Sequence, residues 1–184
     1  MPASSLLLLE RITLIIARHG ETIENGLNIC QGQTHGILSE TGIRQNEKLG
    51  AQLTKYQFQT IYSSPLNRAF QTAKSIQQHT PHSLLITDDR LMERQLGILQ
   101  GEKYPSPYLE SDLYEGMETV ESMAERMNNF LSHIKQKHPG ETIVIVSHGY
   151  IIKVLLSLIN NLPVRDFYKV KLMSNSGFIE VTLE

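Results

Sequence analysis

The sequence has a single cysteine, no long apolar run and no excess of positive charge, and each of these absences narrows the class of protein. With Cys30 alone an internal disulfide is impossible, which fits a reducing compartment. No stretch approaches the ~20 apolar residues that a membrane-spanning helix needs. The formal net charge of −2 provides no global positive field for nucleic acid or an anionic membrane. We therefore expect no nucleic-acid or membrane partner, and any attraction for an anionic substrate must be local.

Residues 6–9 (LLLL) have the composition of a signal-peptide core. However, Glu10 and Arg11 interrupt the run, no basic residue precedes it, and no small-residue cleavage site follows. We therefore expect a cytoplasmic protein. The length of 184 residues and the apolar fraction of 40% predict one globular domain over residues 1–184. A domain of this size buries about 70% of its unfolded surface, so it needs no disulfide or metal to fold.

Short runs rich in β-branched residues alternate along the chain with segments of helical periodicity. Two of the runs, residues 12–17 (ITLIIA) and 142–147 (TIVIVS), are typical of strands buried on both faces. Further strands are predicted over 60–63, 83–87 and 177–183, the last near a sheet edge. Helices are predicted over 39–54, 65–78, 119–137 and 150–159, the second with Pro65 at its first position. This alternation predicts an α/β fold, a three-layer α/β/α sandwich around a mostly parallel central sheet.

Two of the predicted buried strands end in similar motifs. The first runs into Arg18-His19-Gly20 and the second into His148-Gly149. Because parallel strands end at the same edge of a sheet, where open α/β sheets bind ligands, we expect the two histidines to converge. Each glycine lets the backbone leave the strand sharply and approach a ligand closely. Arg68, near the start of the helix that follows residues 60–63, belongs to the same edge.

A site with Arg18, Arg68, His19 and His148 concentrates positive charge in a protein that is net acidic. Arginine binds phosphate oxygens in a planar, bidentate manner. Nearby cations favour the neutral form of a histidine, and a neutral imidazole can attack phosphorus. A histidine or an arginine taken alone is more often a structural residue, so the prediction depends on the joint pattern.

Four segments, in this order and spacing, resemble the histidine phosphatase superfamily, the phosphoglycerate mutase-like proteins. They are RHGETIEN (18–25), SSPLNRAFQTA (63–73), ERQLGILQG (93–101) and SHG (147–149). The resemblance implies a phosphoglycerate mutase-like fold and identifies His19 as the residue that becomes phosphorylated. It implies that Arg18, Arg68 and His148 form the phosphate pocket and that Glu93 is the general acid. Further substrate contacts are implied at Thr22, Asn25, Gln31, Gly32 and Gly149.

The chain departs from the family pattern at the rim of the implied pocket. The family often has an aspartate and then proline-leucine after Gln31-Gly32, where this chain has His35-Gly36-Ile37-Leu38. Tyr150 stands where the family often has a second glycine after the SHG motif. These changes affect the identity of the substrate more than the chemistry, and they leave the roles of His35 and Tyr150 open.

The expected activity is that of a histidine acid phosphatase-type phosphoric monoester hydrolase acting on a small phosphorylated substrate. The arginines and histidines supply the positive charge, so we expect no cofactor and no metal ion. A mutase would need further basic residues, for which Arg90, Arg94 and Lys103 are candidates, and a substantial lid. The expected cap-like excursion, at about residues 101–118, is short and acidic, which favours hydrolysis. A silent phospho-ligand or protein-binding member, a protein-phosphohistidine phosphatase and any oligomeric state stay open.

Overall fold

The computed structural model describes residues 11–183, and the leucine run at residues 6–9 lies outside them. A five-stranded sheet forms the centre, in the order β3-β2-β4-β1-β5. β1 pairs with β4 in parallel, and β2 pairs in parallel with both β4 and β3. Only β5, at one edge, runs antiparallel to its neighbour β1. The strands are β1 (Ile12–Arg18), β2 (Thr60–Ser63), β3 (Leu84–Thr87), β4 (Thr142–Ser147) and β5 (Phe178–Leu183).

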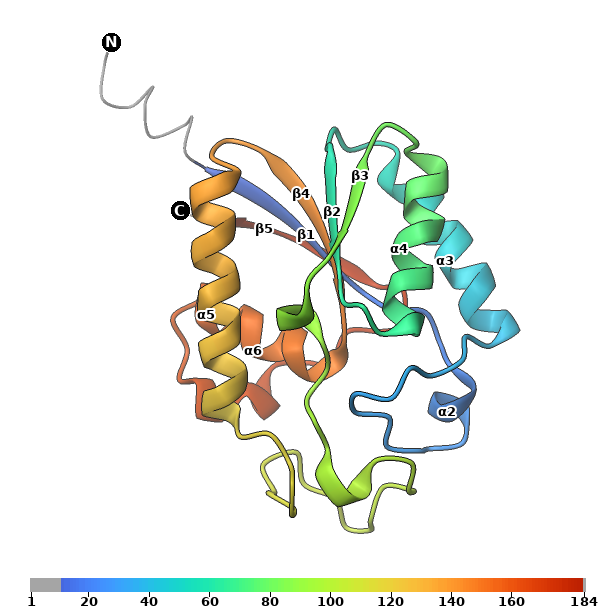
Figure 1. The fold of residues 1–184 in the computed structure, drawn as a ribbon, viewed down its shortest axis with the longest axis vertical. Helices are drawn as coiled ribbons and strands as arrows, with labels where there is room; N and C mark the ends of the chain where they lie inside the picture. Colours follow the sequence, from blue (N-terminus) through green and yellow to red (C-terminus); the bar gives the residue numbers. More distant parts are fainter. Residues whose placement is uncertain (1–10, 184) are drawn as a thin grey trace.

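The sheet is covered by helices on both faces, as Figure 1 shows. Alternate side chains of β1 enter two separate cores: Leu14 and Ile16 pack towards α5 and α6, and Ile15 and Ala17 pack towards α3 and α4. This explains why the sequence of the central strands is apolar throughout rather than alternating. The predicted three-layer α/β/α architecture with a mostly parallel sheet is confirmed. The helices are α3 (Glu40–Leu53), α4 (Asn67–His79), α5 (Val120–Lys137) and α6 (Gly149–Ile159).

The helix starts follow local hydrogen bonding. Ser39 caps α3 by accepting a bond from the Gly42 backbone N–H, and Thr119 caps α5 in the same way. The predicted start of α4 at Pro65 is wrong, because the helix begins at Asn67. The Ser64 hydroxyl accepts a hydrogen bond from the Leu66 N–H, and this turn keeps Pro65 outside the helix.

Two long connections lie at the end of the sheet where β1, β2 and β4 terminate. The first, residues 19–39, contains the four-residue helix α2 (Ile23–Gly26), which the sequence did not predict. The second joins β3 to α5 and contains η1 (Asp89–Leu91) and η2 (Gly97–Leu99). A third 3-10 segment, η3 (Val164–Lys169), follows α6. In Figure 1 the first two connections gather at the lower end of the sheet.

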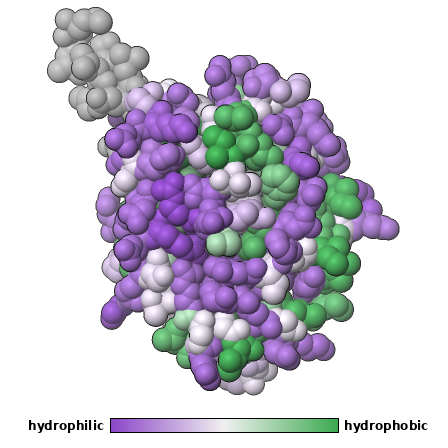
Figure 2. Space-filling view, viewed as in Figure 1, coloured by the Kyte–Doolittle hydropathy of each residue, from purple (hydrophilic) through white to green (hydrophobic). Residues whose placement is uncertain are grey.

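The surface is mixed in character. Figure 2 shows a largely hydrophilic face over α5, with apolar side chains at the margin that carries α2 and α3. Ile23, Ile37 and Ile43 are exposed there. Within residues 11–183, no helix has the length and apolar character needed to cross a membrane.

Candidate active site

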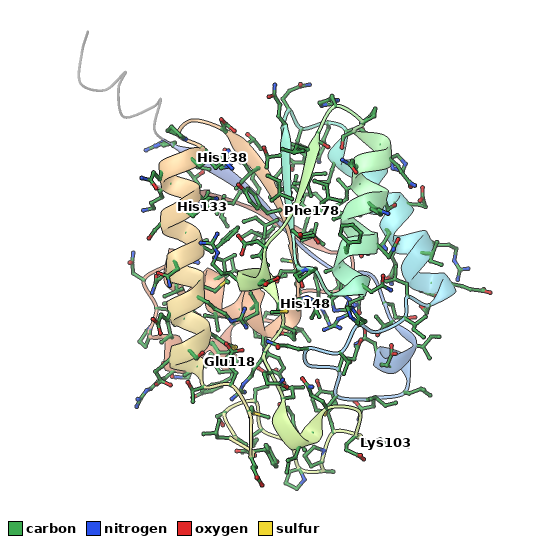
Figure 3. The ribbon with its side chains drawn as sticks, in the orientation of Figure 1. Lys103, Glu118, His133, His138, His148 and Phe178 are labelled. Atoms are coloured by element: carbon green, nitrogen blue, oxygen red, sulfur yellow. The ribbon has the colours of Figure 1, made fainter. Side chains whose placement is uncertain are left out.

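The three motif-bearing strands are neighbours in the sheet, so their ends converge. Arg18 in β1 is in register with Ser147 in β4, and the His19 N–H donates to the Ser147 carbonyl at 3.0 Å. Ser64, directly after β2, donates its N–H to the Val146 carbonyl at 3.0 Å. The rings of His19 and His148 consequently lie 5.1 Å apart between centroids. His148 appears in the middle of the molecule in Figure 3, where the central strands end.

His19 is held as a neutral imidazole whose Nε2 carries the lone pair. Its Nδ1 lies 2.7 Å from the Gly20 carbonyl oxygen, which can only accept a hydrogen bond, so Nδ1 carries the proton. Nε2 therefore accepts the bond from Arg68 Nε at 3.3 Å. Burial, followed by the charges of Arg68 and Arg18, holds the pKa of His19 well below its ordinary value. The ring is thus uncharged at neutral pH, with a proton on Nδ1 and a lone pair on Nε2, as a nucleophile must be.

Arg68 links the loop over the site to helix α4. Besides its bond to His19, its guanidinium donates to the backbone carbonyls of Thr34 at 2.5 Å and Gly32 at 2.8 Å. Burial lowers the pKa of Arg68 to about 10, so the group still carries its charge at neutral pH. Several of its donors therefore hold the loop. The sequence predicted only that Arg68 binds phosphate and did not predict these bonds to the backbone.

Arg18 has more free donors than Arg68. Its Nη1 donates to the Met173 carbonyl at 2.7 Å, while its buried Nε has no hydrogen-bond partner within the described part of the chain. Buried donors of this kind are rare in native proteins unless a ligand or a solvent molecule satisfies them. The side chain lines the same cavity as His19 and Arg68, so this donor is suited to an anion bound between them.

His148 is fully buried beside His19 and is not among the residues that line the cavity. Its Nε2 lies 2.8 Å from the Ser64 hydroxyl oxygen, and its Nδ1 has no hydrogen-bond partner in residues 11–183. The Ser64 oxygen also accepts a bond from the Leu66 N–H. With the Ser64 hydrogen donated to Nε2, the ring proton of His148 lies on Nδ1. Burial and the charge of Arg68 lower the pKa of His148.

Ser64 is a positioning residue that sequence reasoning missed, and it supplies a prediction. In Ser64→Ala the His148 ring loses the donor that selects its tautomer, so we expect kcat to fall on the order of 10-fold. Nitrogen NMR of the His148 ring reads the tautomer directly. Ser63→Ala is the matched control, because the buried Ser63 hydroxyl donates only to the Ser64 carbonyl. Equal losses in both variants, or an unchanged tautomer, would contradict this role.

Glu93 lines the same cavity as the two arginines and lies between η1 and the cap-like excursion. Its carboxylate accepts bonds from the backbone N–H of Arg94 at 2.9 Å and, at the first turn of α6, of Tyr150 and Ile151 at 3.3 Å. Burial raises the pKa of Glu93, although the Arg94 N–H bond and the charge of Arg68 act in the opposite direction. A buried carboxyl with a raised pKa is suited to donating a proton.

The loop after β1 is held together by a network of amides. Thr22 caps α2 by accepting the Asn25 N–H, and Asn25 Oδ1 accepts the Thr22 N–H in return. Asn175, before β5, donates to the His19 carbonyl at 3.1 Å and to Asn25 Oδ1 at 3.4 Å. Asn25 lines the cavity, whereas Thr22 is buried behind it. Asn175 was also missed, because no motif or periodicity in the sequence points to it.

These residues surround a cavity of about 260 Å³, slightly below the ~300–1,000 Å³ of sites for drug-sized ligands. The predicted site residues that line it are Arg18, His19, Asn25, Gln31, Gly32, Arg68, Glu93 and Gly149. Tyr150 also lines it, whereas the exposed His35 is not among the lining residues and receives the Asn67 N–H on its Nδ1. In residues 11–183, no group of three or more His, Cys, Asp or Glu side chains is arranged to hold a metal ion.

The three basic residues considered for a second phosphate do not line this cavity. Arg90 pairs with Asp88 at 2.5 Å, next to α5. Arg94 donates to the backbone carbonyls of Glu118 at 2.9 Å and Glu110 at 3.0 Å, so it holds the excursion in place. Lys103 is exposed on the outer side of the excursion, well away from His148 in Figure 3.

Comparison with known proteins agrees with this geometry. The family model of the histidine phosphatase superfamily (branch 1) matches residues 14–184. The uncharacterized phosphatase PhoE of Bacillus subtilis is 33% identical, with 79% of this chain and 76% of that protein covered. Phosphoglycerate mutase-like protein 4 of Arabidopsis thaliana is 34% identical, with coverages of 77% and 68%. A mycobacterial glucosyl-3-phosphoglycerate phosphatase superposes with a TM-score of 0.84 at 28% identity, covering 91% of this chain and 90% of that one. The chain belongs to the histidine phosphatase superfamily.

Proposed function

We propose that the protein is a phosphomonoesterase that hydrolyses a small phosphorylated metabolite through a phosphohistidine on His19. The observation that carries this proposal is the neutral, buried His19, whose Nε2 accepts a hydrogen bond from a charged arginine in the cavity floor. A nucleophile of this kind, surrounded by cations that can bind an anion, is suited to attack on a phosphoryl group.

In the first step, Arg18, Arg68 and His148 hold the phosphoryl oxygens. The Arg68 Nε–H turns from His19 Nε2 to the bound phosphate, which frees the Nε2 lone pair to attack phosphorus. A P–N bond forms while the P–O bond to the alcohol breaks. The proton of Glu93 passes to the leaving oxygen, so the alcohol departs neutral and Glu93 becomes a carboxylate. The donors around the site stabilise the charge that develops on the phosphoryl oxygens.

In the second step, water attacks the phosphohistidine. The P–N bond breaks, inorganic phosphate leaves, and Glu93 accepts the proton that water releases. His19 returns to the neutral tautomer whose Nδ1 proton bonds the Gly20 carbonyl. Because the protein's own cationic and donor groups supply the stabilising charge, we propose that turnover is independent of a metal ion.

Hydrolysis is favoured over mutase chemistry by the position of the basic residues. A mutase must bind a second anionic group of its substrate, and among the described residues the only arginine or lysine side chains that line the cavity are Arg18 and Arg68. Relatives with both kinds of name, a phosphatase and a phosphoglycerate mutase-like protein, match the chain, so a direct assay must distinguish the two activities.

The test is phosphate release from an aryl phosphate and a panel of metabolite phosphates in the presence of a chelator. We expect turnover of several esters that is unchanged by the chelator. Isomerisation of phosphoglycerate without phosphate release would favour the mutase alternative. Binding without either reaction would favour a silent member. Loss of activity with the chelator, restored by added metal, would contradict metal independence.

A further inference from the structure

Part of the cavity lining consists of aromatic, aliphatic and acidic side chains that were not assigned to the phosphate site. We call this set the outer wall: Leu96, Tyr104, Tyr108, Glu110, Tyr150 and Leu172. The Tyr104 and Tyr108 rings lie 4.8 Å apart, edge to face, and the Tyr108 hydroxyl lies 2.7 Å from the Tyr150 hydroxyl. These contacts join the excursion to the first turn of α6. The outer wall therefore offers a leaving group ring faces, aliphatic carbons and hydroxyls.

Among the described residues, the outer wall contains no arginine or lysine side chain. Glu110 is its acidic side chain, and Glu93 lines the same cavity. The cation bonded to the outer wall is Lys153, which does not line the cavity, and the two arginines that do line it, Arg18 and Arg68, are those assigned to the phosphate. The Lys153 Nζ lies 2.6 and 2.9 Å from the two Glu110 oxygens, and its side chain is only 5% exposed. Arg94 is occupied by carbonyls of the excursion.

From this geometry we propose that the site takes phosphomonoesters of uncharged, ring-bearing alcohols and rejects esters whose alcohol carries a carboxylate. The proposal rests on the phosphatase activity proposed above. A ring packs against the tyrosines and leucines of the outer wall, and its hydroxyls have Glu110 and Tyr108 as partners. A carboxylate there would lose water and meet no free cation of the outer wall, because Lys153 is already paired with Glu110, so its rejection follows from desolvation that no new ion pair offsets.

The experiment compares four esters whose leaving alcohols have similar basicity: ethyl, benzyl, 4-carbamoylbenzyl and 4-carboxybenzyl phosphate. The last two have nearly the same shape and differ in charge, so their kcat/KM ratio reports charge selectivity alone. We expect benzyl phosphate to exceed ethyl phosphate by at least about 10-fold. We expect 4-carbamoylbenzyl to exceed 4-carboxybenzyl phosphate by at least about 10-fold.

Two variants of the Glu110–Lys153 pair test whether this pair causes the discrimination between 4-carbamoylbenzyl and 4-carboxybenzyl phosphate. Glu110→Gln leaves a buried ammonium without its counter-charge, so the carbamoyl-to-carboxyl ratio should fall towards 1. Lys153→Met leaves an unneutralised carboxylate, so the same ratio should rise. Both variants break the same ion pair and loosen the same attachment of the excursion, so a purely structural role would move the ratio equally in both. The double variant Glu110→Gln/Lys153→Met should lie between the two single variants.

The outcomes separate the inference from the function on which it rests. A wild-type protein that hydrolyses 4-carbamoylbenzyl and 4-carboxybenzyl phosphate equally well overturns the charge selectivity and keeps the phosphatase. Equal rates for ethyl and benzyl phosphate overturn the ring preference. If no ester releases phosphate, the proposed function fails. The affinities of the four esters for His19→Ala, measured by calorimetry, then still test the preference for uncharged, ring-bearing alcohols. Shifts of the ratio in the same direction in both single variants overturn the role given to Glu110.

Discussion

Replacing His19 by alanine is expected to abolish turnover of every phosphomonoester. The variant removes the Nε2 atom that forms the P–N bond in the proposed mechanism, and the described residues offer no second nucleophile in the same position. His148 is fully buried with its Nε2 bonded to Ser64, so it does not substitute. Loss of an essential covalent nucleophile costs on the order of 10⁴–10⁶ in kcat. The measurement is kcat for an aryl phosphate, in parallel with circular dichroism to verify folding.

A second measurement on the same pair of proteins tests the intermediate itself. Wild-type protein quenched during turnover should carry an acid-labile, alkali-stable phosphoryl group on His19, located by mass spectrometry, and His19→Ala should carry none. His82→Ala is the matched control, since His82 is exposed and lies outside the catalytic cavity. A His19→Ala protein that retains normal turnover would exclude the phosphohistidine mechanism.

Replacing Glu93 by glutamine is expected to reduce the rate in a way that depends on the leaving group. The amide has nearly the same shape and can still accept a backbone bond, but it cannot donate the proton that an alkoxide needs. General acid catalysis contributes about 10²–10⁴-fold, so esters of alkyl alcohols should lose on that order. An ester with a good leaving group, such as 4-nitrophenyl phosphate, should lose only a few-fold. Equal losses for both classes would contradict the assignment.

The pH dependence of the same variant supplies an independent test. Because burial raises the pKa of Glu93, the wild-type carboxyl stays protonated above the ordinary carboxyl range. Its protonated fraction, and with it kcat for alkyl esters, falls as the pH rises through that pKa. His19 must be neutral, and its lowered pKa keeps it so towards acidic pH. We therefore expect an acidic optimum whose alkaline limb disappears in Glu93→Gln. A limb that persists in the variant belongs to another group.

The sequence determined the strands and the positions of the motifs at their ends. The apolar runs at β1 and β4 bury both faces, and runs of this kind are typical of central parallel strands. Once strands alternate with helices, the carboxyl ends of parallel strands share an edge. The convergence of the segments after β1, β2 and β4 could therefore be predicted without a structure. The end of an element is harder to predict where one side-chain hydrogen bond determines it, as the Ser64 hydroxyl does at the start of α4.

The partners that orient the candidate catalytic groups came only from the tertiary structure. Ser64 follows β2 and contacts His148 after β4, and Asn175 before β5 holds the His19 carbonyl. Such contacts join residues far apart in the chain that share no periodicity and no motif. The resemblance to the family assigned Arg68 to the phosphate, whereas the structure adds the backbone carbonyls that it also holds.

The charge of the cavity was likewise decided by the fold. In the sequence, Arg94 and Lys103 stand close to Glu93 and look available to a substrate. In the structure Arg94 binds carbonyls of the excursion, and Lys153, from the apolar helix α6, is neutralised by Glu110. The sequence thus determines which residues can carry chemistry, because local patterns fix the strands and their ends. Only tertiary structure decides which charges face a substrate, because a charged side chain forms hydrogen bonds with the acceptors that packing places near it.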